Sequence, residues 1–175
     1  MSRTLSLTAL VALCILSTVA LAKAPDNSRA FLKAAASGGA AEVREAEIAL
    51  KRASNLDITD FAKRMIDDHT KANDAVMAFA KARSLKLDTD PTPGQKAEEK
   101  RLRKLNDMGR AFDRTYLDLA IKHHRKTIAL FEKQAKMGSD SAVAAFAATT
   151  LPTLKMHLEM ATNLAAKLDL KSNNN

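Results

Sequence analysis

Three long stretches of the chain each carry one apolar stripe, and each stripe includes a single histidine. In the stretch 112–136, apolar side chains recur at steps of three or four residues around one histidine. This spacing places residues on one face of an α-helix. We therefore expect three helices to turn one histidine each toward the interior. The three stripes are Met65, His69, Ala72, Val76 and Phe79; Leu117, Ile121, His124, Ile128, Phe131 and Ala135; and Leu154, His157, Ala161, Leu164 and Leu168.

The same periodicity, divided by turn signals, predicts four principal helices. We expect them near 40–53, 57–84, 110–136 and 141–168, with short turns inside the first and the last pair. A brief helix over 29–36 should precede them. We expect Ser37-Gly38-Gly39 to break or kink that helix, and Asp57 to cap the second principal helix.

Two helices carry features that bear on packing. In the first, the inner stripe is expected to be Val43, Ala46, Leu50 and Ala53, beside a small-residue stripe of Glu42, Ala46, Ala49 and Ala53 that favours close helix contact. In the last, Pro152 leaves two interpretations open. Either Thr150 caps a new helical segment, or a continuous helix is kinked at the proline.

The long connection between the two helix pairs indicates the fold class. Residues 85–109 contain a Pro- and Gly-rich loop at 88–94 and a short charged helix over 95–108. A helix pair, a long crossover and a second pair are typical of a ferritin-like four-helix bundle, here with a short extra helix in the crossover. An up-down bundle with a decorated loop is the alternative. The composition, with no Trp and few Gly and Pro, agrees with an all-α protein.

The first residues predict export. A positive start with Arg3 is followed by an apolar run over 5–20 and by the small residues of Ala20-Leu21-Ala22. We interpret residues 1–22 as a secretory signal peptide, residues 23–170 as the helical domain and residues 171–175 as a disordered tail. The apolar run is short for a membrane-spanning helix. Because the single cysteine, Cys14, lies in the signal peptide, the mature chain would have no disulfide and no thiolate site. After export, the mature chain would lie in the periplasm or at the outer membrane.

Positive charge is concentrated in the middle of the chain. The full sequence has a net charge of +8, and residues 96–136 alone hold 12 Lys or Arg against 6 Asp or Glu. Such a segment can dock on anionic lipid head groups or other anionic envelope material, or can be a solvated charged face. Nucleic acid is not an expected partner, because the chain is predicted to be exported.

Three phrases carry a resemblance to a known family. They are FAKRMIDDHTKAN (61–73), FDRTYLDLAIKHHRKTIALFEKQAK (112–136) and AFAATTLPTLKMHLEMA (145–161). They closely resemble the bacterial family catalogued as domain of unknown function 4142, often labelled secreted or outer-membrane proteins. The resemblance implies a ferritin-like bundle in the cell envelope, and it supplies no established reaction. The family typically shows the motifs matched by Asp68-His69, by His124 and by Leu151 to His157; His123 stands where an acidic residue is often found.

The inward histidines predict a metal site as the leading specific function. His69, His124 and His157 would be ligands, with Glu42 adding a carboxylate. Asp68 and His123 would flank them. Histidine ligands suit zinc or copper. The Glu-x-x-His motif of di-iron bundles is absent, which argues against a carboxylate-rich oxidase centre. Met65 and Met160 can share faces with their histidines, as Cu(I) ligands or as core filling.

Separate packing of each histidine is the alternative to a shared site. A shared site requires ring nitrogens roughly 3–3.5 Å apart, whereas separate packing would leave the rings at different levels of the bundle. An enzyme is not favoured, because no conventional catalytic constellation is present. Asp68 cannot share a helix face with its neighbour His69, so these two do not form a catalytic dyad by spacing.

Overall fold

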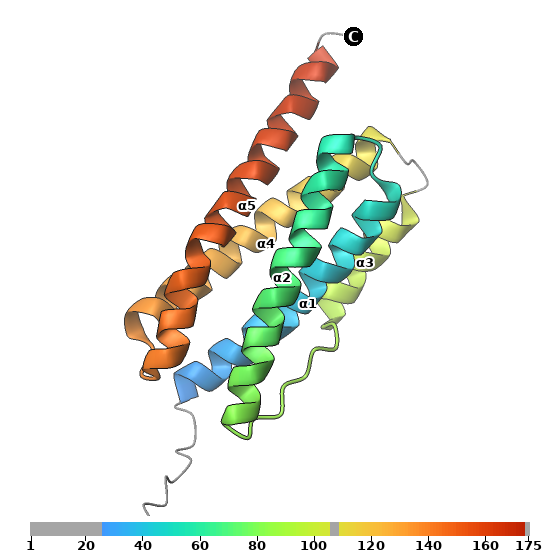
Figure 1. Ribbon diagram of the computed structural model, residues 1–175. Helices are drawn as coiled ribbons and strands as arrows, with labels where there is room; N and C mark the ends of the chain where they lie inside the picture. Colours follow the sequence, from blue (N-terminus) through green and yellow to red (C-terminus); the bar gives the residue numbers. More distant parts are fainter. Residues whose placement is uncertain (1–25, 106–108, 174–175) are drawn as a thin grey trace, which may run out of the picture.

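Helices account for almost all of the chain described by the computed structural model, which covers residues 26–105 and 109–173 (Figure 1). Within these residues there are five helices and no strand. The expected signal peptide, residues 1–22, lies outside the described part. The helices are α1 (Asp26–Arg52), α2 (Leu56–Ala82), α3 (Pro93–Lys104), α4 (Arg110–Met137) and α5 (Ser141–Asn173).

The chain path confirms the ferritin-like arrangement. Helix α1 packs against α2 and α4, and α5 packs against α4 and α2, so that the four long helices form the bundle. After α2 reaches the lower end in Figure 1, the crossover and α3 carry the chain back to the upper end, where α4 begins. Helices α2 and α4 therefore run in the same direction, which rules out a simple up-down bundle.

Helix α1 is longer than the sequence pattern suggested. It continues through Gly38 and Gly39, so the expected break there is wrong. A Cβ atom on Gly39 would overlap the side-chain oxygen of Asn73 on α2, whereas Gly38 faces open space. The absence of a side chain at Gly39 thus lets α1 and α2 approach closely, and this packing offsets the low helix propensity of glycine.

Two other local expectations also differ from the structure. Asn55, not Asp57, caps α2, because its side-chain oxygen accepts the Asp57 backbone N–H at 2.9 Å. Leu50 is 37% exposed and Val43 only half-buried, so the expected inner stripe of α1 is wrong at these two positions, whereas Ala46 is buried as expected. The small-residue stripe faces inward instead, and it carries Glu42 with it into the interior.

Helix α5 is continuous through Pro152 and reaches Asn173. Of the two interpretations of the proline, the continuous helix is therefore the observed one. Residues 171–173, expected to belong to a disordered tail, are helical, and residues 174–175 lie outside the described part. Despite its length, α5 is too polar to span a membrane, and the same holds for every other helix within the described ranges.

Two apolar clusters fill the bundle, one above and one below a polar layer. The upper cluster includes Phe61, Met65, Phe112, Tyr116, Leu117, Leu164 and Leu168. The lower cluster includes Phe31, Leu32, Val76, Phe131, Val143 and Leu154. Each long helix passes through both clusters and contributes buried polar side chains between them. One from each helix forms the histidine layer, which consists of Glu42, His69, His124 and His157; α1 also buries Glu45 there.

Candidate metal centre

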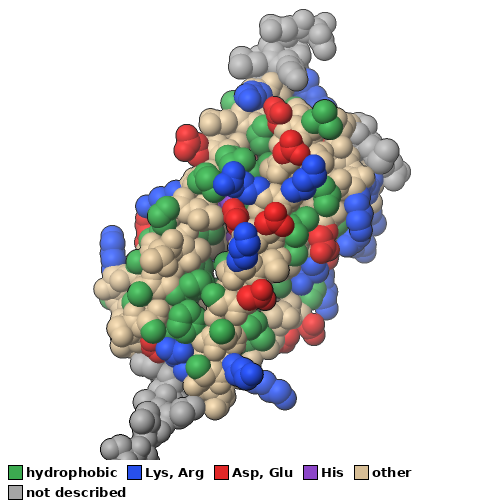
Figure 2. Space-filling view, in the orientation of Figure 1, with side chains coloured by type: hydrophobic (Ala, Val, Ile, Leu, Met, Phe, Trp, Pro, Cys, Tyr) green, Lys and Arg blue, Asp and Glu red, His purple; other side chains and the backbone are tan. Residues whose placement is uncertain are grey.

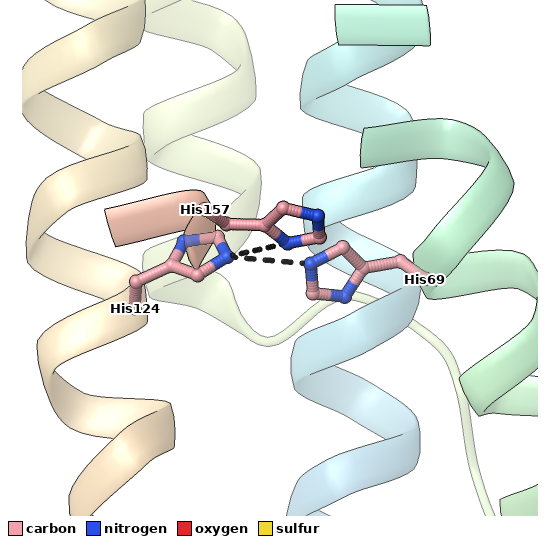
Figure 3. A group of neighbouring side chains, drawn as sticks. All are labelled: His69, His124 and His157. Atoms are coloured by element: carbon pink, nitrogen blue, oxygen red, sulfur yellow. Dashed lines mark hydrogen bonds between the residues drawn. The ribbon is translucent and has the colours of Figure 1, made fainter. Parts of the chain in front are cut away.

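The three inward histidines meet at one level of the bundle (Figure 3). The Nε2 atom of His124 lies 3.4 Å from Nε2 of His69 and 3.4 Å from Nδ1 of His157. One ring nitrogen from each residue lies within 4.8 Å of the other two. Both short separations fall within the spacing expected of nitrogens that share one ion. The rings come from α2, α4 and α5, so the separate levels of the alternative interpretation are not observed.

The cluster is closed off from solvent. His124 and His157 are 0% exposed and His69 is 5% exposed. The upper and lower clusters close the layer along the bundle axis, and the rings of Phe61 and His157 meet nearly at right angles, with centroids 6.3 Å apart. Because burial disfavours the charged imidazolium, it lowers the pKa of His69 to about 3 and that of His124 to about 4, with neighbouring histidines adding to the effect at His69.

The outer nitrogens of two rings have defined hydrogen-bond partners. Nδ1–H of His124 donates to the carbonyl oxygen of Ala120 at 2.9 Å, and Nε2–H of His157 donates to Asp68 Oδ2 at 3.0 Å. A neutral imidazole that donates from one nitrogen presents a lone pair at the other. These contacts therefore orient both rings with their accepting nitrogens toward the centre. Burial also lowers the pKa of His157, although the Asp68 carboxylate opposes that shift.

Glu42 lies beside the histidines, not among their converging nitrogens. Its Oε2 is 3.3 Å from the outer Nδ1 of His69, and its Oε1 is 3.7 Å from the outer Nδ1 of His124. Neither oxygen has a hydrogen bond of good geometry to the described residues. Burial raises the pKa of Glu42 to about 8, while the charge on His123 opposes the shift and that on Glu45 adds to it. The structure thus places the Glu42 carboxylate next to the outer nitrogens of His69 and His124.

The arrangement matches the ligand requirements of a nitrogen-rich metal site. Three converging, neutral imidazoles offer three lone pairs and leave a further coordination position open, as in three-histidine zinc sites. Outer-shell carboxylates and carbonyls that hold ligating histidines are the usual support of such sites. Met65 packs within the upper cluster and Met160 against it, which agrees with the core-filling interpretation of both methionines.

A groove of 640 Å³ lies on the surface beside this centre. It lies between α2 and α5, and its lining includes Asp68, which bonds His157. Acidic and basic side chains stand side by side over this face (Figure 2). The lining includes Asp57, Asp60, Arg64, Asp67, Asp68 and Lys71.

Sequence reasoning named Asp68 and His123 as flanking groups but missed their partners. Asp68 is bonded to His157, on a different helix from its own. His123 faces away from the three histidines, between two glutamates. Those glutamates, Glu45 and Glu98, carry no sequence signal of their own, apart from the one-turn spacing between Glu45 and the inward Glu42.

Comparison with known proteins supplies the family. The model of the family described as "Domain of unknown function (DUF4142)" matches residues 16–164. The chain belongs to this family. No match was found among curated proteins.

Two solved structures share the fold. One is a DUF305 fragment from Deinococcus radiodurans, with 15% identity and a TM-score of 0.74, covering 83% of this chain and 99% of that one. The other, described as "putative secreted protein DUF305", is from Streptomyces coelicolor, with 15% identity and a TM-score of 0.70, covering 82% of this chain and 94% of that one. At this identity the likeness concerns the fold alone.

Proposed function

We propose that the protein binds a transition-metal ion, zinc or copper, in the bacterial cell envelope through His69, His124 and His157. The observation that carries the proposal is the convergence of three buried ring nitrogens, with separations of 3.4 Å about Nε2 of His124. Burying three polar rings costs free energy unless their nitrogens find partners. An ion held by all three supplies the missing partner for each inner lone pair.

The groups around the rings fit a bound dication. Asp68 and the Ala120 carbonyl hold the outer N–H groups of His157 and His124. Glu42, the third supporting group, brings a carboxylate close to the outer nitrogens of His69 and His124. A bound dication would favour the ionised form of Glu42 despite its raised pKa, and the carboxylates of Glu42 and Asp68 would together balance a charge of +2. The groove between α2 and α5 reaches Asp68, the carboxylate that holds His157.

The envelope location rests on two observations. Residues 1–22 have the order of a secretory signal peptide. The Streptomyces neighbour is described in words that point to secretion. Protein recovered from the native envelope should therefore have the intact mass of a chain that begins at Lys23. The metal content of the same sample can then be measured.

Zinc and copper titration of the purified chain, followed by calorimetry, tests the metal site. Wild type should bind tightly, and His124→Ala should abolish tight binding because one of three ligands is lost. Asp68→Asn should weaken binding about 10–100-fold through misorientation of His157. Asp67→Asn is the matched control: the residue is exposed on the same helix, and zinc affinity should be unchanged.

Two results would refute the metal site. One is the absence of zinc and copper uptake by wild type. The other is unchanged affinity in all three single-histidine variants, which would leave the histidines as packing groups.

Docking on an anionic envelope surface is the second candidate function. Buried Leu102 fixes α3 to the bundle, while Arg101, Arg103 and Lys104 are all exposed on its last turns. Reversing these three charges together should weaken binding to anionic vesicles, and the wild-type binding should weaken with salt. Reversal at Lys33, Lys71 and Lys81 is the charge-matched control. Equal partition of the wild type onto neutral and anionic vesicles would identify a solvated face only.

A further inference from the structure

A second group of metal-ligating side chains lies beside the histidine layer. His123 on α4 stands between Glu45 on α1 and Glu98 on α3. Its Nδ1 is 3.1 Å from Glu45 Oε2, and its Nε2 is 3.1 Å from Glu98 Oε2. One nitrogen and one oxygen from each carboxylate lie within 4.8 Å of one another. None of these residues belongs to the histidine layer.

Buried polar atoms without partners surround this group. Glu45 is 2% exposed, and its Oε1 has no hydrogen bond to any described residue. The buried hydroxyl of Tyr116 also lacks one. Burial raises the pKa of Tyr116, and the charge of Glu45 raises it further. Unpartnered buried polar atoms are rare in proteins, and an ion or a water commonly explains them.

An ion pair alone leaves these atoms unexplained. A protonated His123 between two carboxylates would bind Oε2 of Glu45 and Oε2 of Glu98. The second oxygen of Glu45 would stay buried and unpartnered. A cation that takes the place of the proton between His123 and a carboxylate can bind both oxygens of Glu45, or can hold a water that bonds the second oxygen.

We propose that Glu45, Glu98 and His123 form a second divalent-cation site, distinct from the three-histidine centre. Two carboxylates and one imidazole are harder ligands than three imidazoles. Oxygen-rich sites suit Mn²⁺, and mixed sites also accept Fe²⁺. The second site therefore takes a Mn²⁺-class ion, whereas the histidine layer takes zinc or copper.

The local structure allows the ligands to close around such an ion. Glu98 is the most exposed of the three, with 21% of its side chain accessible, so it can move inward from its present position. Lys122 Nζ lies 2.6 Å from Glu98 Oε1, and the cation would replace the contact between His123 Nε2 and Glu98 Oε2. Glu45 follows Glu42 by one helical turn, and His123 precedes His124. The two sites are therefore neighbours at the α1–α4 contact, with separate ligand sets.

Manganese titration of the full chain, followed by electron paramagnetic resonance of free Mn²⁺, tests the second site. Wild type should bind one Mn²⁺ per chain. Glu98→Gln should lower the affinity at least tenfold. Glu99→Gln is the matched control, since Glu99 is the next residue on α3 and pairs with Arg44, 2.7 Å away, outside the site. His124→Ala should retain Mn²⁺, which separates this site from the proposed zinc or copper centre.

The test has three outcomes that would overturn the second site. They are no Mn²⁺ binding by wild type, equal affinity in Glu98→Gln and Glu99→Gln, and loss of Mn²⁺ in His124→Ala with retention in Glu98→Gln. The first two would leave a structural ion-pair network, and the third would place Mn²⁺ in the histidine layer. Circular dichroism melts of both glutamine variants verify that each is folded, and partly exposed Glu98 is chosen over buried Glu45 for that reason.

Discussion

The histidine layer and the two apolar clusters are buried to a similar degree, but they respond to burial in opposite ways. Apolar side chains gain free energy when they leave water, whatever else is bound. Imidazoles and carboxylates lose hydration and must find partners. In the layer, the inner nitrogens meet one another at 3.4 Å, and both oxygens of Glu42 lack hydrogen bonds to the described residues. The clusters therefore account for folding, whereas the layer lacks partners of the kind that the proposed metal ion would supply.

Within each helix this contrast occurs over a few turns. Helix α2, for example, passes from Phe61 and Met65 in the upper cluster to His69 and then to Val76 in the lower cluster. All four side chains are on one stripe or next to it, so the same helical periodicity buries the apolar side chains and turns His69 inward. An apolar residue at position 69 would continue the core without interruption. The bundle can thus be stable without the layer's chemistry, and the two regions can be tested separately.

The largest effect is expected from a change in the upper cluster. Phe112 is 0% exposed, and Phe112→Ala should lower the free energy of unfolding by about 3–5 kcal/mol because it leaves a cavity. If the proposed centre binds zinc, a zinc concentration of about 1,000 Kd should add about 4 kcal/mol to wild type and to this variant alike. His124→Leu should lose that zinc-dependent increment. Urea unfolding with and without zinc measures both quantities.

Leu56→Ala is the control for the cluster, because Leu56 is 79% exposed and its truncation should cost no more than about 0.5 kcal/mol. A zinc increment that disappears in Phe112→Ala would show that the cluster and the layer are coupled, which contradicts the comparison.

A smaller effect is expected at the border between the layer and the lower cluster. Gly39 and Asn73 meet there, one turn from Glu42 and His69 respectively. Gly38→Ala adds a methyl group in open space and should stabilise α1 by up to about 1 kcal/mol, because alanine favours the helix. Gly39→Ala should lose most of this gain, since the Asn73 side chain must rotate away. Thermal unfolding of the two variants gives the difference, and equal gains would show that α1 and α2 are not held in close contact there.

Much of the fold is predictable from the sequence because apolar periodicity determines which face of each helix is buried. The long helices and the inward direction of His69, His124 and His157 follow from their stripes. The errors arose where tertiary packing overrides local signals. At Gly39 the contact with α2 stabilises a helix that glycine alone would weaken. In α1 the small side chains face inward because they allow close helix contact, leaving larger Leu50 exposed.

The candidate site is predictable only in part. Helix periodicity gives the face of a histidine, but its level in the bundle depends on helix register, which loops and distant contacts determine. The sequence also does not predict which side chains on different helices bond to one another. The spacing argument correctly separated Asp68 from His69, yet it could not show that Asp68 reaches His157. The position of His123 between Glu45 and Glu98 likewise depends on three helices meeting.

The smallest effect is expected at an ion pair outside both regions. Arg83, just after α2, bonds the carboxylate of Asp140 at 2.6 Å, and that carboxylate also accepts the Val143 N–H of α5 at 3.2 Å. Burial alone would raise the pKa of Asp140, but these bonds outweigh it and hold the pKa below 3.8. A depressed folded-state pKa stabilises the protein above the unfolded pKa, and the contribution disappears as the pH falls through the folded value.

Asp140→Asn should therefore cost up to about 1 kcal/mol at pH 7, because the pair is near the surface. The cost should shrink below about pH 4. Urea unfolding across this pH range measures it, with Asp118→Asn, on an exposed pair, as the reference. A difference between wild type and Asp140→Asn that stays constant with pH would mean that the carboxylate charge contributes nothing and that Asp140 acts through its neutral hydrogen bonds alone.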